Sequence, residues 1–340
     1  MDTRQCGCRA LAAFTIVVAM KLAETVEDPS DAVWNSADTV LPPRRAKREV
    51  RGKRQRKKQK IDGFTPPAED PPMSTVALDG KVLVVIGGTT GLGLSAARAM
   101  IEAGAKGVVL TGRDDNSARS VQALLGDAAA TFTGDAVDPK HAPSAIALAR
   151  EKFGSFDGLY HVAGGSGRRF GDGPLHEITD EGVRATLEMN LHSLIFSNRA
   201  AVRQFLDQGS AGAVLNMGSV LGWSPSPHYF STHVYAAAKS AVIGFTQSVA
   251  ARYASQNIRF NVIAPALIET PMARRAAEDD QIREFIHSKQ PLDGGRIGRP
   301  DDCDGAAVFL LSDAARFVTG QVLAVDGGWC LSEGQVAAGE

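Results

Sequence analysis

Residues 81–93 read KVLVVIGGTTGLG, and this stretch decides the fold. Its first part, Lys81–Ile86, is a short aliphatic run of the kind expected for a parallel strand buried on both faces. The glycine-rich loop Gly87-Gly88-Thr89-Thr90-Gly91-Leu92-Gly93 follows at once, and Leu94–Gly104 then carries helical spacing that ends at a glycine. Strand, glycine loop and helix in this order are typical of the opening of a dinucleotide-binding sheet.

Glycines suit such a loop because they let the backbone approach a pyrophosphate closely. The following helix offers unpaired N–H groups and a partial positive charge to the same anion. By itself the pattern is equally well a structural turn, so the rest of the chain has to decide between the two interpretations.

The composition agrees with an α/β chain. Of the 340 residues, 44% are hydrophobic, 22% are charged and only 6% are aromatic, which excludes collagen, coiled coil and wholesale disorder. Short aliphatic runs alternate with helical spacing along most of the chain. We therefore expect a Rossmann-like, doubly wound parallel sheet of about seven strands with helices on both faces, in a single domain.

Residues 1–73 differ from the rest of the chain. They hold 14 Lys and Arg against 10 Asp and Glu, and residues 44–60 pack eleven Lys and Arg with a single glutamate. We expect a disordered or non-native extension, with a nuclear or nucleic-acid tag as the other interpretation of the basic run. Leu11–Met20 resembles the core of a signal peptide but is too short to span a bilayer. Residues 74–340 form the predicted catalytic domain, whose acidic balance argues against nucleic acid as a partner.

Four cysteines, Cys6, Cys8, Cys303 and Cys330, show neither a CxxC pair nor metal-ligand spacing. The cysteines therefore predict no metal site, no structural disulfide and a reducing, cytoplasmic compartment. The sequence also predicts no membrane span.

The second aliphatic run, Gly107–Thr111, ends in Gly112-Arg113, where the adenosine ribose of a bound dinucleotide should lie. A carboxylate there suits the ribose hydroxyls of NAD, whereas an arginine suits the 2′-phosphate of NADP. Arg113 thus favours NADP(H). Asp114 and Asp115 come next and keep NAD(H) open.

Two further strands are predicted at residues 131–138 and 158–163. The first would bring Asp135, Ala136 and Val137 to the adenine ring, and the second would bring Ala163 and Gly164 to the cofactor.

Tyr235 and Lys239 lie four residues apart, which on a helix places both on one face. A phenol with an ordinary pKa of about 10 needs a neighbouring cation to work near neutral pH, and Lys239 supplies one. Ser219 ends a fifth aliphatic strand that begins near Ala213, where its hydroxyl can bind a carbonyl or alcohol or can simply serve a turn.

With these motifs in this order, residues 78–330 resemble the short-chain dehydrogenase/reductase family, including its 3-oxoacyl-carrier-protein reductase-like members. The glycine loop matches at Gly87, Gly91 and Gly93, although Ile86 stands where the family usually has threonine. His161-Val162 replaces the two asparagines of the family's Asn-Asn-Ala-Gly, which leaves local hydrogen bonding beside the cofactor in question.

The resemblance implies a catalytic tetrad of Asn190, Ser219, Tyr235 and Lys239, with Asn190 supporting a water that links the lysine to solvent. Residues 265–270, PALIET, resemble the family's Pro-Gly-x-x-x-Thr turn with Ala266 in place of glycine. Pro265, Ile268 and Thr270 would then meet the nicotinamide, although Thr270-Pro271 is also a plausible helix start. A homo-oligomer, tetramer or dimer, is implied as well.

The resulting prediction is an NAD(P)-dependent oxidoreductase that interconverts a ketone and a secondary alcohol on a small molecule. The alternative is a non-catalytic NADP(H)-sensing regulator or scaffold whose basic leader contacts nucleic acid. Residues 272–290 are expected to form a mobile lid over the substrate. Arg168 and Arg169 either meet an acidic substrate or face solvent.

Overall fold

A computed structural model of the protein describes residues 77–334, all of which belong to one compact unit of the chain. The predicted extension at 1–73, with its basic run, lies outside the described residues. Seven parallel strands form one sheet in the order β3-β2-β1-β4-β5-β6-β7. Their bounds are β1 Val82–Ile86, β2 Gly107–Gly112, β3 Ala129–Thr133, β4 Gly158–His161, β5 Gly212–Met217, β6 Ile258–Pro265 and β7 Val322–Val325.

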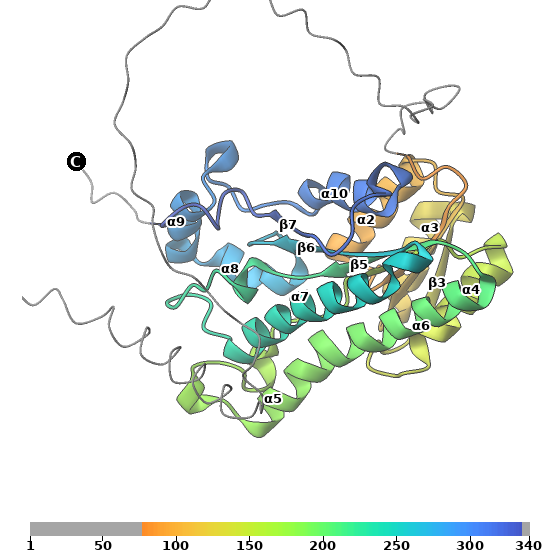
Figure 1. The fold of residues 1–340 in the computed structure, drawn as a ribbon. Helices are drawn as coiled ribbons and strands as arrows, with labels where there is room; N and C mark the ends of the chain where they lie inside the picture. The colour runs from red at the N-terminus through yellow and green to blue at the C-terminus, as the bar shows by residue number, and fades with distance from the viewer. Residues whose placement is uncertain (1–76, 335–340) are drawn as a thin grey trace, which may run out of the picture. The chain divides into compact units, whose positions relative to one another are not determined.

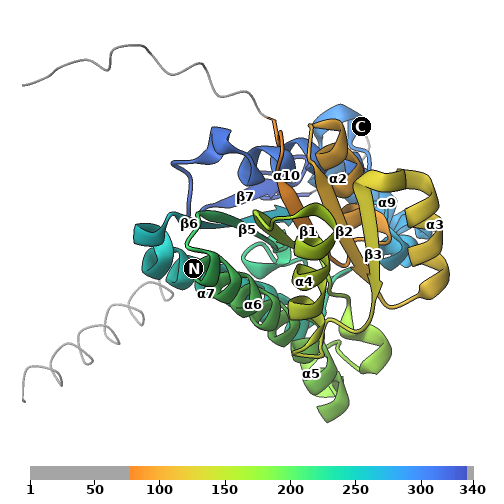
Figure 2. The same cartoon turned by 90° about the vertical axis from the view of Figure 1, so that its right-hand side faces the viewer.

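Helices cover both faces of this sheet (Figures 1 and 2), which confirms the predicted doubly wound fold. Their bounds are α2 Gly91–Glu102, α3 Asp115–Leu125, α4 His141–Phe153, α5 Asp180–Leu187, α6 Ser193–Gln208, α7 His233–Tyr253, α8 Arg274–Glu278, α9 Asp280–Lys289 and α10 Asp304–Leu311. No helix within 77–334 has both the length and the apolar character needed to cross a bilayer.

The central strand β1 is buried along its whole length, as its aliphatic run predicts. Alternate residues serve opposite layers because successive side chains of a strand point to opposite faces. Leu83 and Val85 pack with α2, α3 and α10, whereas Val82, Val84 and Ile86 pack with α4, α6 and α7. The two apolar layers hold the sheet rigid between them.

The strand order reverses at the neighbouring strands β1 and β4. From β1 the chain adds strands outward to β3 on one side, and from β4 it adds them outward to β7 on the other. At such a switch point the loops leaving the carboxyl ends of neighbouring strands diverge and leave a crevice. The topology therefore predicts a ligand cleft beyond Ile86 and His161.

Three predicted boundaries are wrong. Strand β4 ends at His161 instead of running to residue 163. Helix α2 begins at Gly91 rather than Leu94, so the second half of the glycine loop is already helical. Strand β3 runs from Ala129 to Thr133 instead of covering 131–138. It stops there because Asp135 turns the chain back: its carboxylate accepts the Val137 N–H at 3.1 Å and its carbonyl accepts the Asp138 N–H.

Candidate active site

A cleft of about 520 Å³ lies at the carboxyl edge of the sheet and is lined by the loops after β1 to β6. It collects nearly all the residues that the sequence proposes for cofactor binding and catalysis: Gly87, Thr89, Thr90, Gly91, Leu92, Arg113, Asp135, Ala136, Ala163, Gly164, Ser219, Tyr235, Lys239, Pro265, Ile268 and Thr270. Gly93 and Asn190 do not line it. Their positions are explained below by what they support.

The glycine loop is held tightly against β2 and β4. Gly87 adopts φ +85°, a conformation that favours glycine, and its N–H donates to the Thr111 carbonyl at 3.1 Å. A Cβ on Gly87 would come within 2.6 Å of the Ala163 nitrogen. Only glycine therefore fits at this crossing of the two strand ends.

Gly93 supports the loop from behind. A Cβ at this position would collide with the Gly87 carbonyl oxygen, so the first turn of α2 can approach the loop only with glycine there. The start of α2 is open: Thr90 at its N-cap makes no side-chain capping bond, and its first turn carries no acidic residue. Free N–H groups and the helix dipole at this end suit a phosphate anion.

Arg113 lines the cleft at the end of β2 and makes no hydrogen bond or ion pair with the other described residues. The neighbouring Asp114 is already engaged, because its carboxylate caps α3 by accepting from the Ser117 N–H and hydroxyl, both at 2.7 Å. These bonds lower the pKa of Asp114. One of the two carboxylates that the sequence leaves as rivals for the ribose is thus used to start a helix, and the other, Asp115, does not line the cleft.

Ser219, Tyr235 and Lys239 meet at the centre of the cleft. Ser219 follows β5, and its hydroxyl lies near enough to that of Tyr235 on α7 to lower the pKa of the phenol. The Lys239 ammonium, one turn further along α7, lies 5.5 Å from the centre of the Tyr235 ring and donates to the Met217 carbonyl at 2.8 Å. The predicted spacing of four residues does place both groups on one face of the helix.

Burial decides the protonation of this pair. It raises the pKa of Tyr235, an effect that the nearby Ser219 hydroxyl only partly opposes. A net lowering of the phenol pKa is therefore not found, because desolvation is the larger effect; that Lys239 favours the phenolate stays a prediction. Burial also lowers the pKa of Lys239 to about 8. At neutral pH the site holds a protonated phenol beside an ammonium of reduced pKa.

Asp172 supports this site in a way that the sequence does not predict. It is buried, and its two carboxylate oxygens accept the N–H groups of Val234 and Tyr235 at 3.1 and 2.9 Å. It thereby caps the start of α7 from a segment more than sixty residues earlier. The only sequence signal is an acid between Gly171 and Gly173, which says nothing about its partner.

Asn190 lies in a π-helical turn, Glu188–His192, that joins α5 to α6. Its side chain is fully buried and clamps Gly165: the amide oxygen accepts the Gly165 N–H at 3.0 Å, and the amide nitrogen donates to the Gly165 carbonyl at 2.9 Å. The same nitrogen donates to the Thr186 carbonyl. A Cβ on Gly164 would lie 2.7 Å from the Asn190 oxygen. Asn190 therefore shapes the floor of the cleft without entering it.

His161 stands where the related pattern has asparagine, and α6 supplies its partners. Its two ring nitrogens lie 2.8 Å from the Ser197 hydroxyl and 3.3 Å from the Ser193 hydroxyl. Burial and the charge of Lys239 lower the pKa of His161 to about 3, so the ring is neutral. The departure from the family pattern is compensated by hydrogen bonds within the core.

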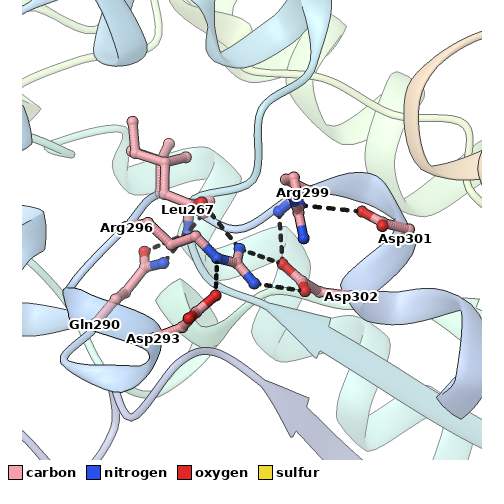
Figure 3. A network of polar contacts seen from close by, with 8 residues as sticks. Leu267, Gln290, Asp293, Arg296, Arg299, Asp301 and Asp302 are labelled. Carbon is pink, nitrogen blue, oxygen red and sulfur yellow. Dashed lines mark hydrogen bonds and ion pairs between the residues drawn. The ribbon is translucent and has the colours of Figure 1, made fainter.

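The loop after β6 forms the wall opposite the glycine loop. The buried Gln290 holds it by accepting the Leu267 N–H at 2.9 Å and donating to the Leu267 carbonyl at 3.3 Å. Figure 3 shows the ion-pair network beside this contact, in which Arg296 binds Asp302 with both terminal nitrogens and Asp293 with Nε. The network lowers the pKa of Asp302 to about 2. Arg296 and Asp302 flank Gly298, which pairs with Ile268.

Residues 272–290 fold into α8 and α9. Ile282 and Ile286 are buried in a small apolar cluster with Trp329, whereas Met272, Ala273, Arg275 and Ala276 line the cleft. The first part of the segment therefore lines the cleft; that the segment acts as a mobile lid over the substrate stays a prediction.

These features fit a bound dinucleotide. The glycine loop, whose space a Cβ would fill, and the uncapped start of α2 suit a pyrophosphate. Arg113 at the end of β2, which pairs with no other described residue, suits a phosphorylated ribose. At the far end, three polar side chains converge on the space where a nicotinamide and a carbonyl would meet.

Comparison with known proteins identifies the family. A family model described as enoyl-(acyl carrier protein) reductase matches residues 87–330. The chain is 32% identical over 253 residues to 2,5-dichloro-2,5-cyclohexadiene-1,4-diol dehydrogenase of Sphingobium indicum, covering 74% of this chain and 98% of that protein. It is 34% identical over 260 residues to L-rhamnose 1-dehydrogenase (NAD(P)(+)) of a Sphingomonas species, covering 74% of this chain and 96% of that protein.

Among solved structures, the 3-ketoacyl-(acyl-carrier-protein) reductase of Brucella melitensis complexed with NADH is similar with a TM-score of 0.66 and 28% identity. The match covers 75% of this chain and all of that one. The glycine-loop opening, the parallel sheet and these matches agree, and the chain belongs to the short-chain dehydrogenase/reductase family of oxidoreductases, which act on alcohol and carbonyl groups.

Proposed function

We propose that this chain uses NADP(H) in preference to NAD(H) to interconvert a ketone and a secondary alcohol on a small molecule. The cofactor would be held by the glycine loop and the start of α2 at its pyrophosphate, by Arg113, Asp135 and Ala136 at its adenosine end, and by residues 265–270 at its nicotinamide. When bound, the nicotinamide supplies or accepts the hydride.

The chain's own residues handle the oxygen and its proton. In the reductive direction, Tyr235 donates its phenolic proton to the substrate oxygen, and Ser219 holds that oxygen by a hydrogen bond from its hydroxyl. The Lys239 ammonium stabilises the phenolate that forms, and the raised pKa of Tyr235 keeps the proton in place until the oxygen becomes basic. Asn190 is a positioning residue, since it acts through the backbone of Gly165. The oxidative direction uses the same groups in reverse.

One observation carries this proposal: Ser219, Tyr235 and Lys239 line the same cleft as the glycine loop, with the Lys239 ammonium 5.5 Å from the centre of the Tyr235 ring. Acid–base and nucleotide-binding features thereby share one space of suitable size. The matches to named dehydrogenases and reductases support it further.

The test is Tyr235→Phe, which removes one oxygen and keeps the ring. Oxidation of NADPH with a panel of ketones is expected to fall at least about 1,000-fold, because general acid catalysis is lost together with the phenolate. NADPH affinity, measured by fluorescence titration, should stay within about twofold, since the ring that packs beside Lys239 remains. Tyr253→Phe is the matched control, because Tyr253 does not line the cleft. Substantial turnover by Tyr235→Phe would refute the role of the tyrosine.

We further propose a cytoplasmic homo-oligomer, a dimer or tetramer. In support, the edge strand β7 and the segments around it expose apolar side chains, with Phe317, Leu323 and Leu331 at 100%, 39% and 93% exposure. Cys303 and Cys330 are both free thiols, which suits a reducing compartment.

The alternative of a non-catalytic NADP(H) sensor has no support from the matched proteins, whose names are those of enzymes. The basic run at 44–60, on which its nucleic-acid contact depends, lies outside the described residues.

A further inference from the structure

Two arginines from separate segments converge on one backbone carbonyl at the rim of the cleft. Arg168, in the short helix Gly167–Phe170, donates to the Tyr229 carbonyl at 3.2 Å, and Arg275, on α8, donates to the same oxygen at 3.4 Å. Both arginines line the cleft. A guanidinium carries five N–H donors, so one shared acceptor leaves most of their capacity unused.

No carboxylate neutralises this pair. Neither arginine takes part in a salt bridge with another residue of 77–334. Asp172 is the acid whose charge reaches Arg168, but both of its oxygens accept N–H groups from α7. Partial burial, followed by the positive charge of Arg275, lowers the pKa of Arg168. Two guanidinium charges near a single carboxylate leave a net positive charge at this place, which an anion would stabilise.

The pair lies at the end of the cleft that holds the tyrosine. Asp172, whose carboxylate accepts the Tyr235 N–H, follows Arg168 by four residues. The carbonyl that both arginines share belongs to the residue before Phe230, whose ring lines the cleft and contacts Trp329 at 5.7 Å. Arg113, at the other end, lies on the loop after β2. An apolar wall with a cationic rim beside a proton donor suits a compound with an apolar body and an anionic end.

We propose that Arg168 and Arg275 form an anion-binding rim for the substrate, and that the alcohol or ketone converted at Tyr235 carries a carboxylate. This inference rests on the proposed function, because it assumes that the reacting carbonyl binds beside Ser219 and Tyr235. Arg169 has no part in it: its guanidinium lies 4.5 Å from the centre of the Phe170 ring, and it does not line the cleft.

The experiment compares two ligands of the same size and shape on the NADPH-saturated full-length protein. Cyclohexanecarboxylate carries the charge, and cyclohexanecarboxamide is its neutral counterpart. Calorimetric titration is expected to show the acid binding at least about tenfold more tightly, because hydrogen bonds to a charged group are stronger than neutral ones. The preference should shrink as salt is raised from about 0.05 to 0.5 M, since the rim is exposed.

Variants assign the preference to the rim. Arg168→Gln and Arg275→Gln should each reduce the preference for the acid to about threefold or less, while amide affinity and NADPH affinity stay within about twofold. Arg169→Gln is the matched control and should keep the full preference. Equal binding of acid and amide by the wild type, or a preference that survives both substitutions, would overturn the inference.

Two more outcomes distinguish this inference from a role of the two arginines in cofactor binding and from failure of the proposed function. If Arg168→Gln and Arg275→Gln weaken NADPH binding and leave the acid preference intact, the arginines serve a cofactor phosphate and the inference is overturned. If the wild type does not bind NADPH at all, the proposed function fails. The acid and amide can then still be compared on the cofactor-free protein, where equal affinities would separately overturn the proposed anion-binding rim.

Discussion

Lys239 shows how burial tunes a single group of this site. Its side chain is only 3% exposed, and desolvation of the charged form lowers its pKa to about 8 from an ordinary 10.5. At pH values between about 8 and 10.5, the Lys239 side chain binds its proton more fully in the unfolded chain than in the folded one. Folding stability contributed by this residue must therefore rise with pH across that window and stay unfavourable below it.

The stability of the wild type relative to Lys239→Met is expected to increase by about 2 kcal/mol between pH 7 and pH 9.5, since one pKa unit corresponds to about 1.4 kcal/mol. Urea unfolding at the two pH values measures it. Lys106→Met is the control, because Lys106 is exposed and its ammonium stays in water. A difference between Lys239→Met and the wild type that does not change with pH would contradict the assigned shift.

We expect the cofactor preference to depend on Arg113. The neighbouring Asp114 caps α3 with its carboxylate, and Asp115 does not line the cleft. Arg113→Gln is expected to weaken NADPH binding about tenfold, the equivalent of one charge-assisted hydrogen bond, and to leave NADH binding within about twofold. Fluorescence titration with both cofactors measures the two affinities. Equal losses for NADPH and NADH would show that Arg113 does not read the 2′-phosphate.

At the scale of elements, the contact between α2 and the glycine loop is the place where a Cβ on a glycine would come nearest to a backbone atom. A Cβ at Gly93 meets the Gly87 carbonyl, which is backbone and cannot swing aside. Gly244, in the exposed middle of α7, has nothing within 4 Å of the same hypothetical atom. The two glycines therefore separate a steric requirement from a helix-propensity effect.

Gly93→Ala is expected to cost about 1–3 kcal/mol of folding free energy, because the helix must move away from the loop, and to weaken NADPH binding as the loop shifts. Gly244→Ala should instead stabilise the protein by about 0.5–1 kcal/mol, since alanine loses less backbone entropy in a helix. Urea unfolding and NADPH titration on both variants give the comparison. Stabilisation by both substitutions would mean that α2 does not need its close approach.

At the scale of the whole molecule, every residue found to line the cleft lies between Gly87 and Trp329. Six of the seven strands lie in the same range, and β1 ends at the residue before Gly87. A variant lacking residues 1–73 is expected to keep its NADPH affinity and ketone turnover within about twofold, because the described lining of the cleft lies entirely within residues 87–329. Fluorescence titration and steady-state kinetics check this. A loss of tenfold or more would assign residues 1–73 a part in the site.

Much of the fold and of the site could be predicted because the signals are local. The buried run of β1, the glycines at the tight turn and the helical spacing of Tyr235 and Lys239 each follow from a short stretch of chain. The end of β3 could not be predicted in this way, since Thr131–Asp138 reads as one continuous strand until the side chain of Asp135 turns the backbone. The start of α2 was placed three residues late because its first turn is made of loop-like glycines.

By itself the sequence determined the parallel sheet, the cofactor loop and the pairing of a phenol with an ammonium, because periodicity and glycine stereochemistry act over a few residues. Only the tertiary structure decided which carboxylate caps α7, which loop Asn190 clamps and that burial raises the Tyr235 pKa. It also decided that Arg168 meets Arg275, more than a hundred residues away, at one carbonyl. These contacts depend on how loops from distant strands pack at one edge of the sheet, and no local pattern records that packing.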